Sequence, residues 1–179
     1  MDDEVLHPGH RSIRLPGFDY SSAGLYFITI CTCEKKSILG HVINERIELS
    51  SIGCIVRESW ISIPSHFVAT RLHEFVIMPN HLHGIVEICA KLGRSSAAPL
   101  PVSAMQAGSI GAIVRSLKAF VTKQARQQLG WSGEVWHRNY FERVLRDGQE
   151  FSNATRYILE NPLKWEWDRE NPNRRSGTR

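Results

Sequence analysis

The chain has few cysteines, no long apolar run and only a small excess of charge. Four cysteines in 179 residues are too few to hold together a small secreted scaffold, so a disulfide-rich fold is excluded. No stretch approaches the roughly 18 apolar residues that a membrane-spanning helix needs, and residues 1–17 lack the apolar core of a signal peptide. A 42% share of apolar residues excludes a disordered polyelectrolyte. We therefore expect one folded domain in the cytoplasm, with no membrane contact.

The positive charge is concentrated in one part of the chain. The 22 basic and 18 acidic residues leave a net charge of only +4. Residues 111–146 alone hold seven Lys and Arg against two Glu, a local excess that exceeds the whole-chain figure. Such clustering is typical of a surface that binds nucleic acid, but a solvated helix face produces it equally often.

Hydrophobic patterning predicts strands and helices that alternate along the chain. Runs rich in β-branched and aromatic residues, bounded by turn residues, predict strands at 25–32, 69–78 and 81–88 and within 135–145, and a short hairpin at 42–49. Apolar residues at helical spacing predict helices at 52–61, 110–129 and 148–161. This order suits an α+β fold, namely a ferredoxin-like (RRM-like) antiparallel sheet with helices on one face and an added C-terminal helix.

Three segments lie outside this pattern. Residues 1–24 contain two Pro-Gly pairs with little periodicity and are predicted to form an N-terminal arm. Residues 91–108 are rich in Ser, Ala, Gly and Pro and are predicted to form a flexible surface loop. Residues 168–179 are predicted to be a polar tail. The folded domain is therefore expected to span residues 25–167.

The two later helices are expected to be amphipathic. In the first, one face is predicted to pack against the core through Ile110, Ile113, Val114, Leu117, Phe120 and Val121, with basic residues opposite. In the second, the predicted buried stripe comprises Phe151, Ala154, Ile158 and Leu159. Proline residues are expected to end two helices, Pro64 the one at 52–61 and Pro162 the last one.

Two histidines begin the predicted strand 81–88. Because alternate residues of a strand share a face, His81 and His83 point the same way and Leu82 enters the opposite layer. Two imidazoles on one face can hold one cation, although such a pair is more often simply part of a polar strand face. Cys31 and Cys33 also share a predicted strand face, and their thiolates would join His81 and His83 in an alternative zinc site. The two cysteines lack the usual CxxC spacing of such sites.

A second polar pair lies on the predicted C-terminal helix. Tyr157 and Asn161 are four residues apart, so they are stacked about one turn apart on the polar face. The alternative interpretation is a tyrosine that packs at the edge of the core with its hydroxyl at the rim.

Three segments in this order resemble the REP-associated tyrosine transposases, an IS200-like branch of the single-tyrosine HUH transposase family. They are EFVIMPNHLHG at 74–84, VWHRNYFE at 135–142 and RYILENPLK at 156–164. The shared signature is His-hydrophobe-His after a proline turn, followed far downstream by Tyr-Ile-x-x-Asn-Pro. The resemblance extends from about residue 25 to residue 165.

This resemblance implies roles for the two polar pairs. His81 and His83 match the HUH pair that binds a divalent cation, Tyr157 matches the nucleophile on the C-terminal helix, and Asn161 matches the residue that completes the metal site. The implied reaction is DNA nicking and strand transfer through a 5′-phosphotyrosine intermediate with a free 3′-hydroxyl. The implied ligand is single-stranded DNA with an adjoining hairpin, as in a REP-like palindrome, and the implied location is the nucleoid. A homodimer is left open.

The chemistry of the residue types agrees with these roles. A tyrosine hydroxyl has a pKa near roughly 10 and is a poor nucleophile at neutral pH unless its charged form or its target is stabilised. A divalent cation on a phosphate oxygen provides that stabilisation. Two imidazoles with an amide oxygen and waters suit Mn²⁺ or Mg²⁺ and offer no thiolate that would favour zinc.

The clustered basic residues are then predicted to bind the DNA backbone. They are Arg115, Lys118, Lys123, Arg126, Arg138 and Arg143. Unpaired bases need stacking partners, and the candidates are Trp131, Trp136, Trp165 and Trp167.

Two other functions remain open from the sequence. One is a ferredoxin-like nucleic-acid-binding module without catalysis. The other is a metal-dependent nuclease in which water attacks in place of Tyr157, with Glu74 or Glu87 as the base. A covalent protein–DNA adduct would distinguish the transposase from both.

Overall fold

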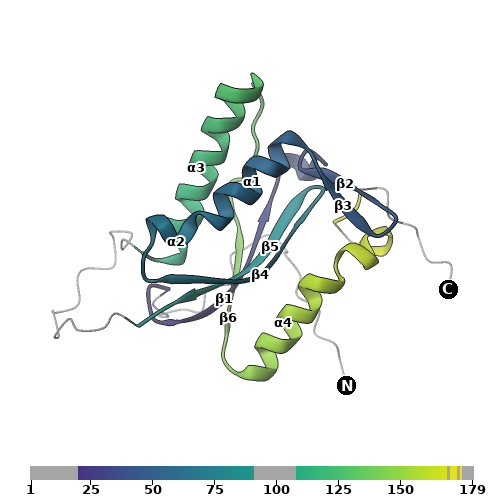
Figure 1. Ribbon diagram of the computed structural model, residues 1–179. Helices are drawn as coiled ribbons and strands as arrows, with labels where there is room; N and C mark the ends of the chain where they lie inside the picture. The colour runs from purple at the N-terminus through teal and green to yellow at the C-terminus, as the bar shows by residue number, and fades with distance from the viewer. Residues whose placement is uncertain (1–19, 91–107, 169, 173, 175–179) are drawn as a thin grey trace.

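The computed structural model describes residues 20–90, 108–168, 170–172 and 174 (Figure 1). Nearly all of the predicted N-terminal arm, almost the whole predicted loop 91–108 and most of the predicted tail lie outside the described residues. In chain order the elements are β1 (Gly24–Cys31), the 3₁₀ turn η1 (Cys33–Lys35), β2 (Gly40–Ile43), β3 (Arg46–Leu49), α1 (Ser51–Ile61), α2 (Ile63–His66), β4 (Thr70–Met78), β5 (His81–Ile88), α3 (Ile110–Leu129), β6 (Phe141–Leu145), α4 (Gly148–Glu160) and the 3₁₀ helix η2 (Pro162–Trp167).

Four strands form one antiparallel sheet in the order β4-β5-β1-β6. The central pair β1 and β5 sets Thr29 opposite His83 and Cys31 opposite His81. The predicted hairpin at 42–49 forms as β2 and β3, which pair with each other in a separate two-stranded sheet. The prediction of an α+β fold with an antiparallel sheet is confirmed.

Helices lie on both faces of the sheet (Figure 1). Alternate residues of a strand point to opposite faces. On β1, Tyr26 and Ile28 therefore join the larger core cluster with α1 and α3, whereas Phe27 joins a smaller cluster with Ala154 and Ile158 of α4. The face that α4 covers is also the face of His81 and His83.

Side-chain caps explain where the long helices begin. Ser50 Oγ accepts a hydrogen bond from Gly53 N at 3.0 Å, and Asp147 Oδ1 accepts one from Glu150 N at 2.8 Å. At its C-terminus α3 ends at Gly130, whose φ of 63° lies in the left-handed region that glycine tolerates. The N-terminus of α3 follows Ser109, whose Oγ accepts a hydrogen bond from Ala112 N at 3.3 Å. These two signals of α3 are why its predicted bounds, 110–129, agree with the structure.

Four details of the sequence-based prediction are wrong. Phe120 is 47% exposed and Leu159 is 60% exposed, because both lie at the margin of their apolar stripes and the packed faces of α3 and α4 are narrower than the stripes. Pro64 does not end α1, which stops at Ile61, but lies in the first turn of α2. Pro162 ends α4 as predicted, yet it also begins η2. Cys33 does not share a strand face with Cys31, because β1 ends at Cys31 and Cys33 starts η1.

Within the described residues, no helix has the length and apolarity to cross a lipid bilayer.

Candidate active site and basic groove

His81 and His83 lie side by side at the start of β5. Their ring centroids are 4.4 Å apart. Both side chains are buried, at 0% and 4% exposure. Phe27 of β1 stacks on the His83 ring, with centroids 5.3 Å apart, and Trp165 of η2 lies near the His81 ring at 6.1 Å. The imidazole pair is thus enclosed between the sheet and the C-terminal helical segment.

Each histidine uses its Nδ1 atom in a hydrogen bond within the protein. His81 Nδ1 is 2.8 Å from Asn80 Oδ1, and His83 Nδ1 is 2.8 Å from Thr29 Oγ1. An amide oxygen can only accept, so His81 Nδ1 carries the hydrogen and donates it. This leaves the lone pair on His81 Nε2, an atom that is buried and has no hydrogen-bond partner among residues 20–90, 108–168, 170–172 and 174.

Helix α4 and its C-cap bring the second polar pair to the histidines. Tyr157 Oη lies 3.4 Å from His83 Nε2, and the two ring centroids are 5.2 Å apart. Asn161, the C-cap residue, is only 3% exposed, and its buried Oδ1 atom has no hydrogen-bond partner in the described part of the chain. The structure therefore brings together His81, His83, Tyr157 and Asn161, which belong to two distant segments of the chain.

Burial controls the protonation of these groups. It lowers the pKa of His81 to about 3. It also lowers the pKa of His83 well below its ordinary value, with a smaller contribution in the same direction from charge repulsion by His81. Both imidazoles are therefore neutral at pH 7, as metal ligands must be. Burial, and then the charge of Asp168, raises the pKa of Tyr157 to about 12, while a hydrogen bond from Asn161 acts in the opposite direction. The phenol is thus protonated at neutral pH.

The atoms left without partners fit a hard divalent cation. Within the part of the chain that the structure describes, two buried acceptors, His81 Nε2 and Asn161 Oδ1, have no hydrogen-bond partner, and His83 Nε2 faces the Tyr157 hydroxyl. Two imidazole nitrogens and one amide oxygen suit Mn²⁺ or Mg²⁺ when solvent or phosphate oxygens complete the shell. In the described part of the chain, no group of three or more His, Cys, Asp or Glu could hold a metal ion. A cation here would therefore depend on the Asn161 oxygen, and the zinc alternative with Cys31 and Cys33 is not supported.

The two carboxylates considered as bases for a water-using nuclease lie away from this site. Glu87 is four residues beyond His83 on β5, about 13 Å along a strand. Its carboxylate contacts His73 Nε2 at 2.9 Å and Arg71 at 3.4 Å instead. Glu74 is exposed on β4, where the pairing register with β5 shifts.

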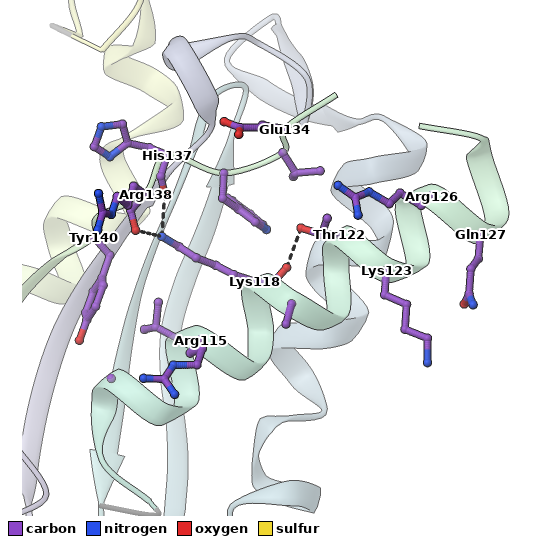
Figure 2. A pocket seen from close by; sticks show the side chains of 15 residues that line it. Arg115, Lys118, Thr122, Lys123, Arg126, Gln127, Glu134, His137, Arg138 and Tyr140 are labelled. Carbon is purple, nitrogen blue, oxygen red and sulfur yellow. Dashed lines mark hydrogen bonds between the residues drawn. The ribbon is translucent and has the colours of Figure 1, made fainter. Parts of the chain in front are cut away.

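A groove of about 870 Å³ lies between α3 and residues 134–140 (Figure 2). Five of the six predicted DNA-binding residues line it, namely Arg115, Lys118, Lys123, Arg126 and Arg138. The sixth, Arg143, does not line it. The Arg143 guanidinium forms an ion pair with Glu150 of α4 at 3.0 Å, on the opposite face of the sheet. Among the described residues, none of the other three arginines and neither lysine of the groove forms an ion pair.

Lys118 differs from the other basic residues of the groove. Its ammonium group donates to the carbonyl oxygens of His137 and Arg138 at 2.8 and 3.3 Å (Figure 2). It also donates to the carbonyl oxygen of Asn139 at 3.0 Å. Burial lowers its pKa to about 8. Lys118 therefore holds the turn at 137–139, which carries Arg138, in place beside the groove.

Strand β1 connects the groove to the histidine pair. On one side Cys31 pairs with His81 in the sheet, and on the other its carbonyl oxygen accepts a hydrogen bond from His137 N at 2.9 Å. The next residue, Thr32, forms a bridge to Trp136, which lines the groove. The two regions are therefore joined through the end of one strand.

The four candidate stacking tryptophans have different environments. Trp136 and Trp165 are buried, at 8% and 9% exposure, and Trp131 is partly buried. The indole nitrogen of Trp131 has no hydrogen-bond partner among the described residues. Only Trp167, at 58% exposure, presents a large free surface.

Sequence reasoning missed three residues of the site, Thr29, Asn80 and Asp168. In the sequence, Asn80 is recognisable only as a residue of the turn before His81. Thr29 could not be identified without the register of β1 against β5, because no local pattern relates it to His83. Asp168 follows η2, and only the packing of η2 against His81 places its charge near Tyr157.

Comparison with known proteins gives one close relative and one shared fold. No protein-family model matches the chain. An uncharacterized protein of Haemophilus influenzae is 43% identical over 164 residues, covering 88% of this chain and 91% of that protein. A second protein of Haemophilus influenzae, a putative REP-associated tyrosine transposase, is 24% identical over 147 residues, covering 82% of this chain and 74% of that protein.

Among solved structures, that of a REP-associated tyrosine transposase bound to a REP hairpin matches with a TM-score of 0.55 at 16% identity, covering 92% of this chain and 76% of that one. The chain therefore belongs to the same family as the uncharacterized Haemophilus influenzae protein, and it has the fold of the REP-associated tyrosine transposases, which it also resembles in sequence.

Proposed function

We propose that the protein is a metal-dependent tyrosine transposase that nicks and rejoins single-stranded DNA beside a hairpin. The observation that carries this proposal is the position of Tyr157 Oη, 3.4 Å from His83 Nε2 and beside two buried acceptors that have no hydrogen-bond partner among the described residues. A structural tyrosine at the rim of the core does not account for those two acceptors, because buried polar atoms are normally paired.

The proposed reaction is a transesterification. Tyr157 Oη attacks the scissile phosphorus, the phosphorus–O3′ bond breaks, and the phenolic proton is lost as the 3′-oxygen gains one. The products are a 5′-phosphotyrosine and a free 3′-hydroxyl, and attack by a second 3′-hydroxyl reverses the step without ATP. A divalent cation, Mg²⁺ or Mn²⁺, held by His81, His83 and Asn161 would polarise the phosphate and offset the developing charge.

The chain's own residues orient the nucleophile. Phe27 contacts the Tyr157 ring edge-on, with centroids 6.0 Å apart, and His83 contacts it from β5. Asn161 follows Tyr157 by one helical turn, so one placement of α4 positions both the phenol and the amide. Since burial raises the pKa of Tyr157 to about 12, the phenol depends on electrostatic help to react at neutral pH.

The basic groove supports the nucleic-acid part of the proposal. Four of its cationic side chains, Arg115, Lys123, Arg126 and Arg138, have no ion-pair partner among the described residues, so they can bind phosphates. The solved transposase of the same fold is bound to a REP hairpin. We infer that the stem of a hairpin lies in the groove and that the adjoining strand passes the end of β1 toward Tyr157.

The finer fold assignment belongs to the same proposal. The order β1, α1, β4, β5, α3, β6 with the sheet order β4-β5-β1-β6 supports a ferredoxin-like core, to which α4 is added as the helix that carries the nucleophile. A nucleoid-associated location in the cytoplasm follows if the protein acts on chromosomal hairpins.

The test is a covalent adduct. Single-stranded DNA with a REP-type hairpin and a 3′ label is incubated with the protein and Mn²⁺, and products are separated in denaturant. We expect a labelled protein band that Tyr157→Phe abolishes and that Tyr26→Phe, a buried tyrosine on the opposite face of the sheet, retains. An adduct that survives Tyr157→Phe would refute the nucleophile, and cleavage without any adduct would indicate attack by water.

A further inference from the structure

Asn80 is a buried turn residue whose side chain is fully engaged. It lies between β4 and β5, directly before His81, and is 1% exposed. Turn residues are normally at the surface, where water satisfies their polar groups. Here the amide oxygen meets His81 Nδ1 at 2.8 Å, while the amide nitrogen donates to the carbonyl oxygens of Lys35 at 3.1 Å and Glu170 at 2.6 Å.

The two carbonyl contacts determine which way the Asn80 amide faces. Carbonyl oxygens only accept, so both must be met by the NH₂ group, and the amide oxygen is left toward His81. That oxygen in turn requires a hydrogen on His81 Nδ1. The backbone at residues 35 and 170 thereby dictates, through one side chain, that the lone pair of His81 is on Nε2.

The tautomer of the other histidine, His83, is not determined by its neighbour. His83 Nδ1 meets Thr29 Oγ1 at 2.8 Å, and a hydroxyl can either donate or accept. Thr29 therefore orients the His83 ring without imposing its tautomer. Of the two, only His81 has its tautomer determined by its neighbour.

We propose that Asn80 is a positioning residue that holds His81 in the Nδ1–H tautomer, so that Nε2 is ready to accept a divalent cation. The role of the cation rests on the proposed function, whereas the tautomer is a property of the free protein. Residues that orient metal-binding histidines in this way typically change metal affinity 10–100-fold when they are replaced. Asn80 also ties the segments around Lys35 and Glu170 to the site, and these two residues form an ion pair at 2.7 Å.

The first measurement needs no metal and no DNA. In ¹⁵N-labelled protein, two-bond ¹H–¹⁵N correlation spectra report which ring nitrogen of each histidine carries the hydrogen, and His81 is assigned by its absence from His81→Gln. We expect Nδ1–H for His81 in the wild type and in Asn80→Asp, which keeps an acceptor oxygen, and a mixture of tautomers in Asn80→Ala. An Nε2–H tautomer in the wild type, or an unchanged tautomer in Asn80→Ala, would overturn the proposal.

The second measurement is Mn²⁺ binding to the same proteins, which is monitored through the electron paramagnetic resonance signal of free Mn²⁺. We expect the Kd of Asn80→Ala to rise about 10–100-fold. Asn153→Ala is the matched control, since this exposed asparagine accepts hydrogen bonds from Gln149 and Arg156 of its own helix. An unchanged Kd in Asn80→Ala would refute the positioning role, whereas the expected tautomer in a wild type that binds no Mn²⁺ would refute the proposed function and leave the orientation of His81 intact.

Should Asn80→Ala fail to show a cooperative thermal transition, the wild-type and Asn80→Asp spectra decide alone. Loss of the Nδ1–H tautomer in a folded Asn80→Asp would contradict the proposal.

Discussion

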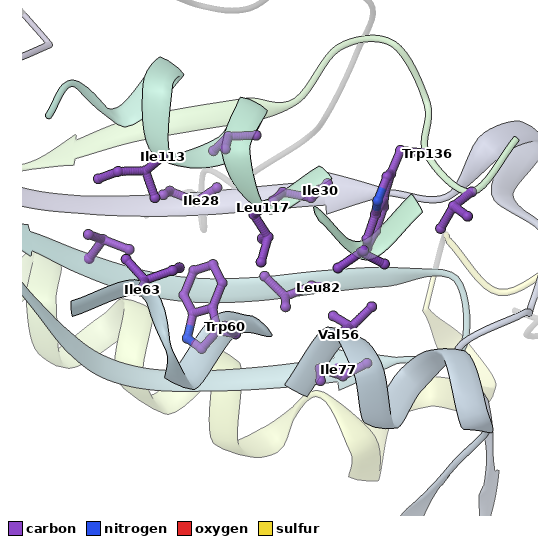
Figure 3. Packing of buried hydrophobic residues seen from close by; sticks show 14 of the residues in the cluster. Ile28, Ile30, Val56, Trp60, Ile63, Ile77, Leu82, Ile113, Leu117 and Trp136 are labelled. Atoms are coloured by element: carbon purple, nitrogen blue, oxygen red, sulfur yellow. The ribbon is translucent and has the colours of Figure 1, made fainter. Parts of the chain in front are cut away.

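Replacing Gly84 by alanine should destabilise the protein, because the core of α1 and the candidate active site meet at this residue. Gly84 directly follows His83 on β5, and the buried Trp60 indole of α1 lies against it. Figure 3 shows Trp60 among the residues of the main core. An added Cβ would lie 2.3 Å from Trp60 Cζ2, 2.8 Å from Cη2 and 3.1 Å from Phe75 Cβ, whereas ordinary contacts begin at 3.4 Å. The indole must therefore retreat by about 1 Å inside a close-packed core.

The size of the effect follows from two opposing contributions. Overpacking of a core costs about 1–3 kcal/mol. The reduced backbone freedom of the unfolded chain offsets about 0.4–1 kcal/mol of this. We therefore expect the free energy of unfolding to fall by about 1–2 kcal/mol, which reduces the ratio of folded to unfolded protein roughly tenfold.

The assay is urea unfolding followed by circular dichroism, with an unchanged m-value expected. Gly148→Ala is the control, since no described heavy atom beyond its chain neighbours and the adjacent helix backbone lies within 4 Å of its added Cβ, and alanine favours the first turn of α4. In the double variant Gly84→Ala/Trp60→Phe the smaller ring should relieve the overlap, so that the two changes cost less together than their sum. A Gly84→Ala protein as stable as the wild type, or strictly additive costs, would refute this reasoning.

Three further predictions concern acid stability, the groove and the helix that carries Tyr157. Because burial lowers the pKa of His81 to about 3, and that of His83 in the same direction, the unfolded state binds more protons than the folded state below pH 6.5. Stability should therefore fall with falling pH, by up to about 1.4 kcal/mol per pH unit for each histidine, and His83→Gln should flatten this slope in urea titrations between pH 6.5 and pH 4. Lys123→Met should reduce the slope of the logarithm of the hairpin-binding constant against the logarithm of salt concentration by about 0.9, as the loss of one phosphate contact requires. Lys118→Met should also weaken binding at high salt, because the turn at 137–139 loses its anchor. Fluorescence anisotropy at several salt concentrations separates the two variants, and identical behaviour would contradict the anchoring role. Asp147→Ala should cost about 1 kcal/mol by removing the N-cap of α4, and Asp147→Asn should recover most of this loss in thermal melts.

Sequence periodicity was sufficient for features that depend on neighbours along the chain. The bounds of α3 follow from the Ser109 cap, the apolar spacing and Gly130. The shared face of His81 and His83 follows from strand alternation. Phe120 and Leu159 were placed wrongly because periodicity shows the mean direction of an apolar stripe but not the width of the surface that packs against it. Cys33 was assigned to a strand because no residue near it marks the end of β1 at Cys31.

By itself, the sequence determined the main strands and the three longer helices, the shared faces of each polar pair, and a resemblance to a transposase family that the shared fold supports. Only the tertiary structure decided that Tyr157 meets His83 across 74 residues of chain, that Asn80 and Thr29 orient the two imidazoles, and that Arg143 faces away from the groove. The physical reason is that these contacts depend on strand order, on the register of β1 against β5 and on which face of the sheet each helix covers. Such properties arise from packing between distant segments, and no local pattern of residues encodes them.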